Sequence, residues 1–116
     1  MSSAFHIGDD TFWGSNGAID TYLEVMKDLA VAHLGAQDPL AVHLTEIHES
    51  RRSSARSRVV LLDHWLLDAE SRDRFLWLLD TATDVVLHQG TFTNAGREWI
   101  AMVVTKLRTR IAACTF

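Results

Sequence analysis

The sequence has few of the residues that form tight turns or cross-link a chain. Its 116 residues include one proline, Pro39, six glycines and one cysteine, Cys114. So little turn-forming material argues against an all-β sandwich and favours long helices joined by short connections. A single cysteine excludes an internal disulfide framework, so we expect the reducing environment of the cytoplasm.

Membrane and targeting signals are also missing from the sequence. No apolar run approaches the length of a membrane span, and the residues from Met1 to Ile7 lack the basic-then-apolar pattern of a signal peptide. We therefore expect a cytoplasmic protein without a membrane partner. Apolar residues make up 47% of the chain and include four tryptophans and five phenylalanines. This composition at this length predicts one domain, residues 1–116, around one core.

Helical periodicity of apolar residues marks four segments, each with a capping or terminating residue at its ends. The expected helices run from Ser15 or Asn16 to Gly35, from about Pro39 to Arg52, from Asp68 to Gly90, and from about Ala95 onward. Residues 4–13 instead predict a short hairpin, because two apolar and aromatic stretches flank Gly8-Asp9-Asp10.

The segment Arg58–Leu67 fits two patterns. The run Val59-Val60-Leu61-Leu62 is typical of a buried strand, whereas Val59, Leu62 and Leu66 also share a helical stripe. We favour a helix here. The predicted fold is mainly α, a compact bundle of four or five helices with a short N-terminal β element, and it becomes α+β if residues 58–63 form a strand.

Charge is unevenly distributed along the chain. Residues 1–50 contain eight acidic and one basic residue (−7), residues 51–58 contain four arginines and no acid (+4), and residues 59–116 contain seven acidic and six basic residues (−1), which sum to the net charge of −4. An acidic first half repels a phosphate backbone and suits a basic protein partner. The sequence therefore argues against nucleic acid as the main partner.

The predicted partner-binding residues are carboxylates of the hairpin and of the first helix, together with one indole: Asp9, Asp10, Asp20, Glu24, Asp28 and Trp13. The three acids of the first helix follow at four-residue steps and form an acidic ridge relieved only by Lys27. Aromatic anchors carry much of the energy of protein interfaces. Trp77 and Trp99 lie off the clearest apolar stripes, so either one of them is exposed as such an anchor or all four tryptophans fill the core.

No complete catalytic or metal-binding motif is present. His43 and Glu46 share a helix face and supply two ligands, but a third would have to approach from elsewhere in the chain. Adjacent side chains diverge, so Asp63 and His64 do not form a catalytic pair. We therefore expect no metal, no cofactor and no enzymatic activity.

The leading hypothesis is a small interaction protein that binds and neutralises or regulates a basic protein. Its most concrete form is an immunity or antitoxin protein that blocks a nuclease-type toxin, with carboxylates in the place of phosphates. The alternative is a small enzyme or a ligand- or metal-binding helical bundle that uses a His43/Glu46 pocket. A third hypothesis assigns phosphate contacts to the basic stretch Arg51–Arg58, which otherwise forms a solvated connection.

Overall fold

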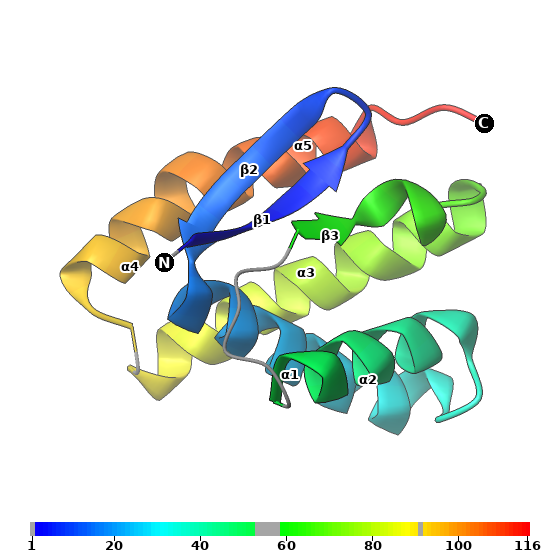
Figure 1. Cartoon of the computed structure of the whole chain (residues 1–116), viewed down its shortest axis with the longest axis horizontal. Coiled ribbons are helices and arrows are strands. Elements are labelled where there is room, and N and C mark those ends of the chain that lie inside the picture. Colours follow the sequence, from blue (N-terminus) through cyan, green and yellow to red (C-terminus); the bar gives the residue numbers. More distant parts are fainter. Residues whose placement is uncertain (1, 53–58, 91) are drawn as a thin grey trace.

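Helices form most of the chain and carry a small sheet on one side (Figure 1). The computed structural model describes residues 2–52, 59–90 and 92–116. In chain order the elements are β1 (Ser2–Ile7), β2 (Asp10–Ser15), α1 (Asn16–Leu34), α2 (Pro39–Arg52), β3 (Val59–Leu61), the 3₁₀ turn η1 (Leu62–His64), α3 (Ala69–Gln89), α4 (Asn94–Trp99), the π-helical segment η2 (Ile100–Val104) and α5 (Thr105–Ala112). The prediction of a mainly helical fold with a short N-terminal β element is confirmed.

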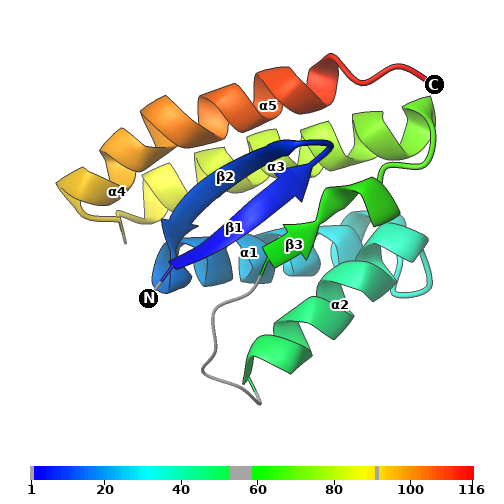
Figure 2. The same cartoon turned by 45° about the horizontal axis from the view of Figure 1, so that its top comes forward.

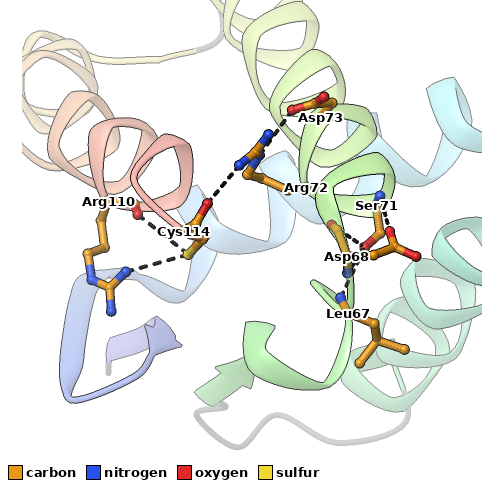
Figure 3. A network of polar contacts seen from close by, with 7 residues as sticks. All are labelled: Leu67, Asp68, Ser71, Arg72, Asp73, Arg110 and Cys114. Atoms are coloured by element: carbon orange, nitrogen blue, oxygen red, sulfur yellow. Dashed lines mark hydrogen bonds and ion pairs between the residues drawn. The ribbon is translucent and has the colours of Figure 1, made fainter. Parts of the chain in front are cut away.

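Side-chain caps fix where the long helices begin. The Ala18 N–H donates to Ser15 Oγ at 3.1 Å, so the polar residues before α1 act as a cap. At the start of α3, the Ser71 N–H donates to Asp68 Oδ1 at 2.7 Å, and the Asp68 N–H donates to Ser71 Oγ at 3.1 Å. This reciprocal capping box holds the pKa of Asp68 below its usual value, because the ionised carboxylate accepts the hydrogen bonds of Ser71 (Figure 3).

The sheet has the strand order β2-β1-β3, with β1 antiparallel to β2 and parallel to β3. The preference for a helix over residues 58–67 is therefore wrong for Val59–Leu61, which form β3. Val60 pairs with Phe5 of β1, and both side chains are buried. A strand gains its backbone hydrogen bonds from a neighbour distant in sequence, so the local apolar pattern could not decide between strand and helix.

One hydrophobic cluster joins the inner face of the sheet to the helices. The sheet lies over α1 and α3, α2 packs beside α1, and the segment from α4 to α5 runs along α3 (Figures 1 and 2). Tyr22 of α1 is fully buried in this cluster, and its hydroxyl lies 3.0 Å from Thr83 Oγ1 of α3. Burial raises the pKa of the Tyr22 phenol.

Trp99 joins the C-terminal helical segment to the hairpin. Its indole Nε1–H donates to the Trp13 carbonyl at 2.6 Å, and its ring lies against Tyr22 at 5.7 Å between centroids. A Cβ on Gly14 would stand 2.7 Å from Trp99 Cζ2, so this close approach requires glycine. The π-helical turn that follows at Ile100–Val104 was not predicted from the sequence.

Among the helices in the described part of the chain, none combines the length and apolar character needed to cross a membrane.

Candidate functional site

The two acidic residues predicted in the hairpin have different surroundings. Asp10 accepts from Arg110 Nε of α5 at 2.7 Å, and this hydrogen bond raises the pKa of the guanidinium. Asp9 is exposed in the turn itself. The Gly8 N–H donates to Asp63 Oδ2 at 2.9 Å, which holds the same turn to η1. Asp10 is therefore ion-paired within the fold, whereas Asp9 is exposed to solvent.

Arginines of α3 and α5 are engaged around the C-terminal tail (Figure 3). Arg110 Nη1 donates to Cys114 Sγ at 3.5 Å, and Arg72 Nη1 donates to the Cys114 carbonyl at 2.7 Å. Arg72 also reaches Asp73 at 3.0 Å. These contacts bind the tail to both helices, so the two guanidinium groups of this region are hydrogen-bonded within the fold.

The acidic ridge predicted on α1 is only partly exposed. Glu24 and Asp28 lie on the solvent face, while Asp20 is half-buried. Asp28 lies 3.3 Å from the ammonium of Lys27 and keeps 68% of its side chain exposed. Glu24 and Asp28 are therefore the members of the ridge that are most accessible to a partner.

A second exposed stripe lies on α2, the helix that packs beside α1, and was missed at the level of sequence. Val42, Glu46 and Glu49 are exposed at spacings of four and three residues, so they share one face of α2. On α1, Glu24, Asp28 and Val31 repeat this spacing. The helices are antiparallel neighbours joined by the short loop 35–38 (Figure 2). Counted along the chain from this loop, the valine comes first on each helix and the two acids follow. We call the following six residues the acidic α1–α2 surface: Glu24, Asp28, Val31, Val42, Glu46 and Glu49.

Trp13 lies on a different surface, the outward face of the sheet. Its side chain is 56% exposed, and the strand register aligns it with Ala4 of β1 and Val59 of β3. Val59 and Leu61 are 47% and 44% exposed on the same face, because residues two apart on a strand point the same way. Trp13 is therefore exposed, and its role as an anchor stays a prediction, whereas the acids predicted with it lie elsewhere.

The structure thus separates the predicted site into three places. The hairpin turn lies beside the end of α5 at the top of Figure 1, whereas α1 and α2 lie at the bottom, with α3 between them. Of the six predicted residues, Glu24 and Asp28 share the acidic α1–α2 surface, and Asp20 is half-buried on α1. Asp9 and Asp10 lie at the hairpin turn, and Trp13 lies on the sheet.

The His43/Glu46 pair does not point into one pocket. The His43 ring stacks on Trp65, with centroids 5.7 Å apart and planes 5° from parallel. His43 and Trp65 line a small cavity of about 160 Å³ together with Asp38, while Glu46 is exposed. Within residues 2–52, 59–90 and 92–116, no three side chains of the His, Cys, Asp and Glu types are placed to hold a metal ion.

The basic stretch Arg51–Arg58 falls mostly outside the described residues, and the phosphate-contact hypothesis stays a prediction. No family model, curated protein or solved structure matches this chain.

Proposed function

We propose that the protein binds a basic protein partner through the acidic α1–α2 surface. The observation that carries the proposal is the exposure of four carboxylates on two neighbouring helices, in a stretch, residues 16–50, whose only lysine or arginine is Lys27. Carboxylates that keep their charge toward solvent attract a basic surface over a distance and accelerate association.

The two exposed valines give this surface an apolar part. Val31 is 40% exposed and Val42 is 37% exposed, and both lie near the loop between the helices. Binding surfaces commonly combine an apolar centre, which contributes affinity, with charged surroundings, which select the partner. The same combination supports a protein partner over a simple counter-ion.

In its most concrete form, the partner is a nuclease-type toxin and the protein is its cytoplasmic immunity or antitoxin protein. A nuclease presents lysine and arginine side chains to the phosphates of its substrate. The four exposed carboxylates would form ion pairs with those side chains and so exclude the nucleic acid. They are Glu24, Asp28, Glu46 and Glu49.

The test begins with capture of binding proteins from host lysate, followed by titration of the purified partner by calorimetry. The triple variant Glu24→Gln, Asp28→Asn, Glu46→Gln is compared with a matched control, Asp9→Asn, Asp84→Asn, Glu98→Gln, which removes the same charge from exposed sites elsewhere. We expect the first variant to bind at least about tenfold more weakly, ~1.4 kcal/mol, and the control to bind as the wild type does.

Salt provides the second part of the test. We expect wild-type affinity to fall as ionic strength rises from about 50 to about 500 mM, because screening weakens contacts between exposed charges. Equal losses in both triple variants would show that only total charge matters, and an affinity independent of salt would show that the carboxylates do not face the partner. Either result would refute the proposal.

A further inference from the structure

A cavity of about 620 Å³ lies between the C-terminal end of α1 and the first half of α3. Its walls are mainly apolar, and six side chains from these two helices line it: His33, Leu34, Glu70, Asp73, Arg74 and Trp77. None of them belongs to the acidic α1–α2 surface. The volume is in the range that accepts a side chain of a partner or a small ligand.

The exposed indole of Trp77 forms part of this cavity. Trp77 is 43% exposed, and its ring makes an edge-type contact with His33, with centroids 5.2 Å apart and planes at 72°. The contact places the indole at the border between the two helices. An accessible indole attracts a cation through the negative potential of its ring face.

Charges around the cavity also favour a cation. Arg74 contacts Asp38 at 2.8 Å and Glu70 at 2.5 Å, and Arg72 contacts Asp73 at 3.0 Å. Three carboxylates against two guanidinium groups leave a charge of −1.

We propose that this cavity receives an arginine side chain. The guanidinium would lie on the indole of Trp77 and donate to the Asp73 carboxylate, while its aliphatic stem packs against Leu34. Arginine suits the cavity better than lysine, because a planar guanidinium stacks on an aromatic ring and donates to a carboxylate through two N–H groups. The inference rests on the proposed function only for the source of the arginine, an exposed residue of the basic partner.

The probe is N-acetyl-arginine methylamide, followed by NMR through the indole N–H resonance of Trp77. We expect a saturable shift of this resonance and no saturable shift of the Trp13 indole, which lies on the outer sheet face. The citrulline analogue has the same shape without the charge, and we expect it to bind at least about tenfold more weakly. No saturable shift, equal binding of citrulline, or binding of the lysine analogue as tight as that of arginine would overturn the proposal.

Two variants locate the site. Trp77→Leu and Asp73→Asn should each weaken arginine binding at least about tenfold, with the shift followed at His33 for the first variant. Trp13→Leu removes another exposed indole and should leave binding unchanged. Folding of each variant is checked by circular dichroism, and arginine binding that survives in folded Asp73→Asn overturns the assignment of its carboxylate.

The proposal for the cavity and the proposal for the acidic α1–α2 surface can be refuted independently. The triple variant Glu24→Gln, Asp28→Asn, Glu46→Gln leaves the cavity unaltered, so it should bind the arginine probe as the wild type does, even if no basic partner exists. Loss of probe binding in that variant would place the arginine on the acidic α1–α2 surface and overturn the cavity assignment.

Discussion

Acidic residues have different roles on the two sides of α3. On the side of α5 and the hairpin, Asp80 accepts from Arg108 at 2.7 and 3.0 Å, and Asp10 pairs with Arg110. On the side of α1 and α2, carboxylates such as Glu24 and Glu46 project into solvent. Asp10 and Asp80 therefore hold elements together, whereas Glu24 and Glu46 are presented to solvent. The side of α3 alone does not set the role, because Asp9 in the hairpin turn is exposed and Asp38 before α2 pairs with Arg74. Net charge alone does not distinguish these uses.

The largest effect is expected where the hairpin meets the C-terminal segment. Gly14→Ala places a Cβ 2.7 Å from the ring of Trp99, so the ring must shift and its hydrogen bond to the Trp13 carbonyl is strained. We expect a loss of about 1–3 kcal/mol in the free energy of unfolding, measured by urea denaturation. Gly17→Ala is the control, because its Cβ would meet nothing within 4 Å and alanine favours a helix. Equal stability of the two variants would contradict the close packing.

A smaller effect is expected between α1 and α3. Tyr22→Phe removes the hydroxyl that contacts Thr83, and we expect a loss of about 0.5–1.5 kcal/mol. The raised pKa of Tyr22 adds a pH dependence. Its contribution to stability is fully present below the unfolded pKa and is lost as pH rises through the folded pKa, so alkaline destabilisation should be weaker in Tyr22→Phe.

Tyr22 is the only tyrosine of the chain, so the ultraviolet absorbance of phenolate reports on this residue alone. We expect its titration to occur above the usual tyrosine range in the folded protein and to return to that range in denaturant. A normal titration in the folded state would show that the hydroxyl is accessible to water.

The smallest effect concerns the cap of α3. The pKa of Asp68 is lowered in the folded state, so its contribution to stability is present above the unfolded pKa and is lost as pH falls through the folded pKa. Asp68→Asn keeps a side-chain acceptor but does not titrate. We expect the thermal midpoint of the wild type to fall more steeply on acidification than that of Asp68→Asn. Parallel curves for the two proteins would argue against the capping box as the cause.

Local signals in the sequence predicted most of the helices. Ser15, Pro39, Asp68 and Gly90 mark helix ends through their own backbone and side-chain chemistry, and such preferences need no distant partner. A strand over residues 59–61 was an alternative to the preferred helix, and the local pattern could not decide because the hydrogen bonds of β3 come from β1, far away in the sequence. The π-helical segment after Trp99 gave no comparable signal.

The candidate site was less predictable than the helices. The four-residue steps on α1 correctly indicated one exposed face for Glu24 and Asp28. The role of Asp10 depends on Arg110 at the other end of the chain, which no local pattern shows. The sequence pairs Glu46 with His43 because they share a helix face. In the structure the His43 ring stacks on Trp65, whereas Glu46 is exposed.

The most direct test compares two double variants that remove the same charge. Glu24→Gln with Glu46→Gln alters the acidic α1–α2 surface, and Asp10→Asn with Asp80→Asn alters the internally paired acids. Partner affinity and the free energy of unfolding are measured for both. We predict that the first variant loses affinity and keeps its stability, while the second loses stability and keeps its affinity. Equal effects of the two variants on both quantities would contradict the division of roles between the exposed and the paired acids.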